Sequence, residues 1–252
     1  MWPFTSKEDR EINKTVQQIN NFIVSELKNK GLISLYLAGT ILWKKERTHN
    51  SDIDFFGIVS EKFKHEFESK VNNKLAAKQK TLCNGYESRF RAFPLSVLKG
   101  EKEAEWGTVK FMRPERILQR FPFFKLIWGK NFNFKKDFLK PMSLKQEARY
   151  LIPLFKKSII DLRTGKERFP YTDFPKHIFE LVRIEAMKEH NLKYTPERQK
   201  LVNHLKKEKN HIIHEAMRLR NKKDLSRKEV LVFANKVELY VKEFEKKIKK
   251  WK

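Results

Sequence analysis

Residues 37–55 read LAGTILWKKERTHNSDIDF, and this stretch decides the fold. The apolar run ISLYLA ends at Ala38 and has the length of a short strand, and a second apolar run, IDFFGIV, begins at Ile53. Between the two runs, Gly39 and Thr40 open a predicted short helix, which leads into a polar loop. The stretch therefore predicts a strand, a turn with a helix start, a loop and a second strand.

Asp52 and Asp54 are two residues apart at the start of the second strand. Because successive side chains of a strand point to opposite faces, these carboxylates share one face. Two carboxylates on one face repel each other unless a cation lies between them, and Mg²⁺ binds such oxygen ligands together with substrate phosphates. The turn at Gly39 and Thr40 can offer backbone N–H groups and a hydroxyl to a phosphate. The segment therefore predicts binding of a divalent cation and a phosphate-bearing ligand.

The same residues resemble the signature of the DNA polymerase β-like nucleotidyltransferase superfamily. That signature consists of a hydrophobic residue, Gly-Ser or Gly-Gly, a spacer, and then Asp-hydrophobic-Asp or Asp-hydrophobic-Glu. Here eleven residues separate Thr40 from Asp52, Ile53 and Asp54. Thr40 stands where Ser or Gly is usual, which keeps the hydroxyl of Ser and adds a methyl group.

The resemblance implies an α/β domain, with a mixed sheet and flanking helices, that binds a nucleoside triphosphate. It implies that Asp52 and Asp54 hold Mg²⁺ or Mn²⁺. It also implies that the enzyme transfers a nucleoside monophosphate (NMP) to an acceptor hydroxyl, with AMP from ATP as the first candidate. The acceptor stays open between a small molecule, a protein and an RNA. The implied nucleotide-binding residues all precede Asp52 in the chain: Gly39, Thr40, Lys44, Arg47 and Ser51.

The superfamily uses a third carboxylate on a later strand, and Glu87 in YESRFRAF is the candidate. It would complete the metal site or accept the proton of the acceptor hydroxyl. Alternation places Glu87, Arg89 and Arg91 on one face of this strand. Such a face fits a strand that lines a nucleotide site, and it also fits an exposed edge strand on which Glu87 pairs with an arginine. Glu61 and Asp137 are the next candidates for the third acid.

The spacing of hydrophobic residues along the sequence divides the chain into two parts. Residues 1–140 combine helical and strand patterns and form the predicted catalytic domain, whereas residues 141–252 show helical patterns alone. Amphipathic helices with short connections predict an all-α helical bundle in this second part. A transferase domain followed by a bundle resembles the aminoglycoside and minimal nucleotidyltransferases. The predicted bundle helices cover residues 143–163, 174–190, 196–220 and 226–250.

The composition limits the classes of protein that remain. The 252 residues include 56 Lys and Arg against 31 Asp and Glu, a net charge of +25. Such a charge favours polyanionic partners, and it also fits a lysine-rich, well-solvated surface. The single cysteine excludes an intramolecular disulfide and a cysteine-rich zinc site. Because the chain has no long apolar stretch and no secretory signal pattern, we expect a cytoplasmic protein without a membrane partner.

Two alternatives stay open at this point. The first is a non-catalytic module on the same fold that holds RNA or a protein through its basic surface, although intact Asp52 and Asp54 favour catalysis. The second is a HEPN-type ribonuclease, because two pairs have the loose Arg–His spacing of that class: Arg183 with His190, and Arg198 with His204. Such spacings also arise by chance in a chain with this many arginines.

Overall fold

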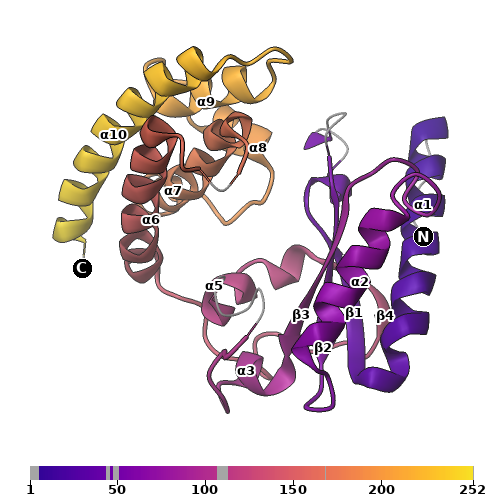
Figure 1. Ribbon diagram of the computed structural model, residues 1–252. Coiled ribbons are helices and arrows are strands. Elements are labelled where there is room, and N and C mark those ends of the chain that lie inside the picture. Colours follow the sequence, from indigo (N-terminus) through magenta and orange to yellow (C-terminus); the bar gives the residue numbers. More distant parts are fainter. Residues whose placement is uncertain (1–5, 44–45, 48–50, 107–112, 168, 252) are drawn as a thin grey trace. The chain divides into compact units, whose positions relative to one another are not determined.

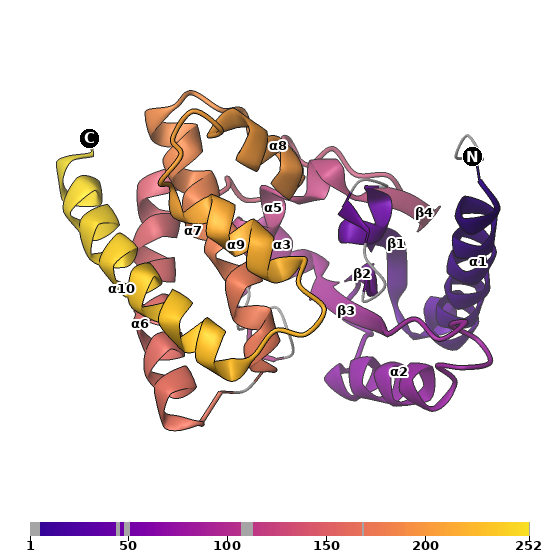
Figure 2. The ribbon, with the colours of Figure 1, turned by 90° about the horizontal axis from the view of Figure 1, so that it is seen from above.

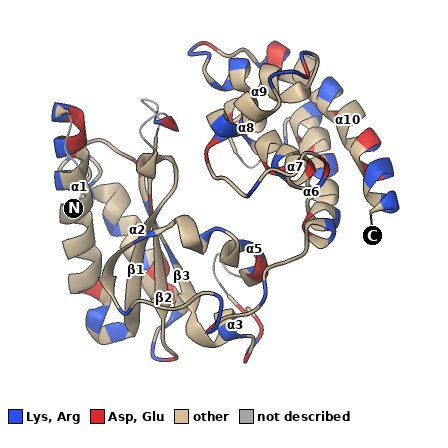
Figure 3. Ribbon diagram, turned by 180° about the vertical axis from the view of Figure 1, so that it is seen from behind, with Lys and Arg blue, Asp and Glu red and all other residues tan. Residues whose placement is uncertain are grey.

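The computed structural model describes residues 6–43, 46–47, 51–106, 113–167 and 169–251. The chain divides into two compact units, Met1–Pro141 and Met142–Lys252 (Figure 1). Each unit has buried hydrophobic clusters of its own. Figure 3 shows that basic and acidic residues are interspersed on both units, so the positive charge is not confined to one of them.

In the described residues, the first unit contains a four-stranded sheet with the order β3-β2-β1-β4. β1 is antiparallel to β2 and to β4, whereas β2 and β3 are parallel. β1 and β2 are central and almost fully buried, which explains why both are continuous apolar runs. This mixed sheet confirms the predicted fold class. The strands are β1 (Leu32–Ala38), β2 (Ile53–Val59), β3 (Ser88–Pro94) and β4 (Lys125–Gly129).

Two helices, α1 (Lys7–Leu27) and α2 (His65–Ala77), pack on one face of the sheet (Figures 1 and 2). The α1 helix begins where the Ser6 hydroxyl accepts the Asp9 N–H at 3.2 Å. Its apolar side chains recur at helical spacing, and Ile19 and Ile23 are fully buried in the same cluster as the strand residues. These two helices therefore hold the central strands β1 and β2 from one face of the sheet.

The other face of the sheet carries an aromatic layer. Tyr36, Phe56 and Phe93 project from the strands and meet the segment that contains α3 (Leu95–Lys99), α5 (Pro114–Leu118) and η4 (Phe121–Phe123). The Phe56 and Phe93 rings stack with centroids 5.3 Å apart, and the Tyr36 and Phe121 rings meet edge to face at 5.5 Å. Phe56 comes two residues after Asp54, so this aromatic layer lies on the face that Asp54 also occupies.

The second unit is a helical bundle, as the sequence predicts. Its described helices begin and end close to the predicted positions, with one exception in the range 196–220, which is not a single helix. Ser143 with Gln146, and Ser226 with Glu229, form complete capping boxes at two helix starts. The α-helices are α6 (Leu144–Thr164), α7 (Phe174–Glu189), α8 (Arg198–His204), α9 (Ile212–Arg220) and α10 (Arg227–Lys250).

The break between α8 and α9 has a physical cause in the residues at 206–210, KKEKN. These five residues include no apolar side chain that could continue the buried stripe of a longer helix. A new helix then begins after His211, whose Nδ1 accepts the Ile213 N–H at 3.2 Å. No helix in the described ranges is long and apolar enough to cross a membrane.

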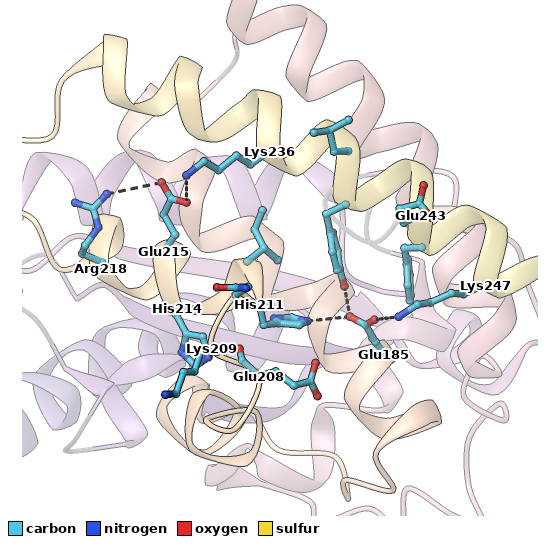
Figure 4. A pocket seen from close by; sticks show the side chains of 15 residues that line it. Glu185, Glu208, Lys209, His211, His214, Glu215, Arg218, Lys236, Glu243 and Lys247 are labelled. Atoms are coloured by element: carbon cyan, nitrogen blue, oxygen red, sulfur yellow. Dashed lines mark hydrogen bonds and ion pairs between the residues drawn. The ribbon is translucent and has the colours of Figure 1, made fainter.

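Glu185 of α7 is the centre of a buried polar network that lines a pocket of about 830 Å³ (Figure 4). Its carboxylate accepts hydrogen bonds from Tyr240 Oη at 2.6 Å and from Lys247 Nζ at 2.6 Å, and it lies 3.2 Å from His211 Nε2. Burial raises the pKa of Glu185, but the bonds from His211, Lys247 and Tyr240 outweigh it and lower the pKa to about 2. The ionised carboxylate therefore joins α7, α9 and α10.

We expect this network to make the stability of the protein depend on pH at the acid end. The pKa of Glu185 is about 2 in the folded chain against an ordinary value of 4.5, so its stabilising effect is present above the ordinary value and is lost as the pH falls toward 2. The shift corresponds to about 3 kcal/mol of unfolding free energy. Glu185→Gln should remove a similar amount near neutral pH, measured by urea unfolding, because a neutral amide replaces the ionised acceptor of the bonds from Lys247, Tyr240 and His211.

Glu245→Gln is the matched control, because Glu245 of α10 makes an exposed ion pair with Lys156 at 2.7 Å. Removal of an exposed pair should change the unfolding free energy by less than about 1 kcal/mol. Equal effects of the two variants would show that the buried network contributes nothing beyond a surface ion pair.

Candidate active site

The topology brings three chain segments to one edge of the sheet. β1 ends beside the start of β2, because the two strands are antiparallel and Ala38 pairs with Asp54. β3 starts beside the start of β2, because these strands are parallel and Ser88 pairs with Ile53. The turn after β1, the Asp52–Asp54 segment and Glu87 therefore meet at this edge.

Gly39 makes the turn that brings β1 to this edge. Its φ of 85° lies in the left-handed region, which a residue with a side chain rarely adopts. A Cβ at this position would also lie 3.3 Å from Asp54 Oδ2. Thr40 then opens η2 (Thr40–Leu42), and its hydroxyl donates a hydrogen bond to Ser51 Oγ at 3.4 Å. Gly39 therefore borders Asp54, and the bond between Thr40 and Ser51 joins the turn after β1 to the segment that precedes Asp52.

Asp54 is held by an arginine from the neighbouring strand. Arg91 Nη1 donates to Asp54 Oδ1 at 2.9 Å, and the two side chains are 21% and 15% exposed. The Arg91 guanidinium also lies over the Phe56 ring, 5.5 Å from its centroid. Burial raises the pKa of Asp54 to about 6, with Arg91 opposing the rise and the Asp52 charge adding to it. The nearby charges of Arg91 and Arg89 therefore do not outweigh the burial of this carboxylate.

Glu87 lies just before β3 with its backbone fixed and its side chain exposed. Its carbonyl accepts the Ile53 N–H at 2.9 Å, which ties it to the start of β2. Its side chain is 57% exposed and pairs with Arg89, whose Nε donates to Glu87 Oε1 at 2.9 Å. This is the arginine pairing that the sequence analysis allowed for, and it occurs beside the aspartates. The role of Glu87 as third carboxylate stays a prediction.

The edge strand β3 is held by side chains of α2. Asn72 donates to the Phe90 carbonyl at 2.8 Å and accepts the Phe90 N–H at 2.8 Å. The Glu68 carboxylate accepts the Ala92 N–H at 2.9 Å. These bonds satisfy backbone groups that an edge strand would otherwise leave open. They fix β3 in the register that places Arg91 beside Asp54.

Two of the predicted nucleotide-binding residues have other surroundings or lie outside the description. The Arg47 side chain is buried, and its guanidinium binds Asp9 of α1 at 2.6 Å and the Ile41 carbonyl at 2.8 Å. A phosphate contact by Arg47 therefore requires the pair with Asp9 to open. Lys44 lies outside the described residues.

The two substitute acids lie in other contacts. Glu61 follows the far end of β2, and its carboxylate accepts hydrogen bonds from Ser96 Oγ at 2.6 Å and Lys102 Nζ at 2.7 Å. Asp137 accepts the Asn133 N–H at 2.8 Å and closes a local turn. Of the three acids considered, Glu87 alone lies directly before the strand that starts beside Asp52 and Asp54.

Arg89 and Arg91 are the neighbours of the candidate site that the sequence analysis left without a role. Alternation places them on one face of β3, but only the parallel pairing of β3 with β2 brings that face to the aspartates. Asp54 pairs in register with Arg89, and Phe56 with Arg91. Within the described ranges, no three His, Cys, Asp or Glu side chains are grouped closely enough to hold a metal by themselves.

The first Arg–His pair of the HEPN alternative makes contacts within the bundle. Arg183 is buried and donates from Nε to the Thr195 carbonyl at 2.8 Å. It also pairs with Glu180 at 3.1 Å. His190 lies 3.4 Å from Glu208 across this unit. These contacts join helices and loops of the bundle.

Comparison with known proteins gives one informative result. Neither a protein-family model nor a curated protein matches the sequence. The solved structure of a spectinomycin adenyltransferase from Enterococcus faecialis, with ATP and spectinomycin, matches at a TM-score of 0.62 and 15% identity. The match covers 91% of this chain and 99% of that one. This chain has a nucleotidyltransferase fold. At such low identity the likeness establishes the fold, and the activity has to be argued from the site.

Proposed function

We propose that this protein is a metal-dependent nucleotidyltransferase that moves a nucleoside monophosphate, AMP from ATP, onto a hydroxyl group of an acceptor. The observation that carries the proposal is the meeting of Asp52 and Asp54 with the turn at Gly39 on one sheet edge. The nucleotidyltransferase fold and the ATP in the spectinomycin adenyltransferase structure support it.

The residues at this edge fit a divalent cation. Asp54 lies near the start of β2 beside the turn at Gly39, Asp52 comes two residues earlier in the chain, and the Asp52 charge acts on the Asp54 carboxylate. Gly39 leaves the space beside Asp54 Oδ2 clear, since a Cβ there would approach it to 3.3 Å. Carboxylate oxygens are the ligands that Mg²⁺ prefers. A Mg²⁺ ion bound there would neutralise negative charge on the attacking oxygen and on the leaving oxygen at the α-phosphorus.

The remaining residues of the site would bind the phosphates and deprotonate the acceptor hydroxyl. The Thr40 hydroxyl and the backbone of the turn after Gly39 would bind phosphate oxygens, and Ser51 accepts a hydrogen bond from Thr40. Glu87 accepts the proton of the acceptor hydroxyl as that oxygen bonds to the α-phosphorus, and the bond to pyrophosphate breaks with its electron pair. The exposure of Glu87 suits a base whose partner arrives from solvent.

The test is transfer of label from α-labelled ATP, CTP, GTP and UTP in the presence of Mg²⁺ or Mn²⁺. The acceptors to offer are aminocyclitol and aminoglycoside hydroxyls, total RNA and proteins, beginning with spectinomycin because the structural neighbour was solved with it. We expect labelled product and pyrophosphate that disappear with EDTA. Metal-independent RNA binding, unchanged in Asp52→Asn and without nucleotide binding, would instead support the non-catalytic module.

A further inference from the structure

Arginines from β3 already bind two of the acidic residues of the candidate site. Arg91 pairs with Asp54, and Arg89 pairs with Glu87. The two pairs differ in their surroundings: the Arg89 and Glu87 side chains are 47% and 57% exposed, whereas those of Arg91 and Asp54 are 21% and 15% exposed. Solvent screens the first pair and leaves it weak, whereas the second is partly desolvated and ties its two members together more strongly.

A cation at Asp54 competes with Arg91 for the same carboxylate. The guanidinium donates directly to Asp54 Oδ1 at 2.9 Å and lies over the Phe56 ring, 5.5 Å from its centroid. A metal ion alone would displace the Arg91 guanidinium, which is 21% exposed, and leave it without an anionic partner. An unpaired charge in such a partly desolvated position is energetically costly. A metal ion that arrives with a triphosphate brings a replacement anion, and the planar guanidinium fork suits phosphate oxygens.

We propose that Arg91 is a nucleotide-binding residue that exchanges partners: it pairs with Asp54 in the metal-free protein and binds the triphosphate when a cation binds Asp54. The exchange couples metal binding to nucleotide binding, so that each ligand strengthens the other. It rests on the proposed function, because it needs a nucleotide and a cation at this edge. Arg89 serves as the internal comparison, since its pair with Glu87 is exposed.

The first test measures ATP binding without metal, in EDTA, by equilibrium dialysis. Asp54→Asn should tighten this binding by about tenfold, because it releases Arg91 for the phosphates. In an Arg91→Met background the same change should act less than about threefold, leaving only the relief of charge repulsion. An equal effect of Asp54→Asn in both backgrounds overturns the proposal.

The second test measures Mn²⁺ binding without nucleotide, by electron paramagnetic resonance of free Mn²⁺. Arg91→Met should bind Mn²⁺ about tenfold more tightly than wild type, and clearly more tightly than Arg89→Met. Equal gains in the two variants would mean a general charge effect and would contradict a specific exchange. Arg91→Gln repeats both tests if the Met variant does not fold. Arg163→Met, which removes an exposed pair with Glu238 in the helical unit, is the control for handling.

The two proposals can fail separately. If wild type binds neither Mn²⁺ nor ATP in the presence of Mg²⁺, the proposed function is wrong and the exchange falls with it. If wild type binds both, and Arg91→Met changes neither Mn²⁺ affinity nor the effect of Asp54→Asn, the transferase stands and only the exchange is wrong.

Discussion

Asp52→Asn and Asp54→Asn are each expected to abolish nucleotidyl transfer while leaving the protein folded. Each change removes one unit of negative charge from the pair that would hold the cation. A metal ion contributes several kcal/mol to stabilisation of the transition state, so its loss should cost at least about 10³-fold in turnover. The measurement is the rate of label transfer at saturating ATP and metal, beside the melting curve of each variant.

The melting curves separate a catalytic role of Asp54 from a structural one. Burial and the Asp52 charge raise its pKa to about 6 from an ordinary 3.8. An acid with a raised folded pKa is stabilising only while protonated, so this contribution is lost as the pH rises from 3.8 to 6. The free energy of unfolding of Asp54→Asn relative to wild type should therefore be higher near pH 8 than near pH 5. Loss of the charged partner of Arg91 offsets part of this gain.

Asp161→Asn is the control for this pair of variants. Asp161 of α6 belongs to the helical unit and carries a mostly buried carboxylate that pairs with Lys157 at 3.0 Å. We expect it to retain transfer activity. Near-normal turnover in Asp52→Asn or Asp54→Asn would rule out the metal assignment, and collapse of the Asp54→Asn fold near pH 8 would make its role structural.

The sequence is sufficient to place Gly39, Asp52 and Asp54 at one edge of the sheet. Strand alternation fixes the face of the two aspartates, and the glycine marks the point where β1 must turn. These are local rules that act within about twenty residues, and so they can be read from one segment. The contact between Arg91 and Asp54 depends on which strand lies beside β2, and in which direction, and no local pattern contains that information.

Other contacts escaped prediction for the same reason. Arg47 appeared as a loop cation near phosphate, but it pairs with Asp9, 38 positions earlier in the chain. The Glu185 network joins residues from 26 to 62 positions apart. Helical periodicity predicted one helix over 196–220, because apolar residues recur on both sides of the interruption at 206–210. Local period describes which residues can be buried, but it does not show where a polar run ends one helix and begins another.

Glu87→Gln is expected to reduce turnover by about 10²- to 10⁴-fold, the range for a positioned general base. ATP binding in the presence of Mg²⁺ should change far less, because the variant keeps its backbone bond to Ile53 and the aspartates are intact. The measurements are kcat and KM for ATP at saturating metal. Glu101→Gln is the matched control, since Glu101 is 58% exposed and pairs with Lys99 at 3.4 Å, much as Glu87 is 57% exposed and pairs with Arg89. If Glu87→Gln changes kcat no more than Glu101→Gln does, the base is another acid, and the start of β3 serves only to hold Arg89 and Arg91 beside Asp54.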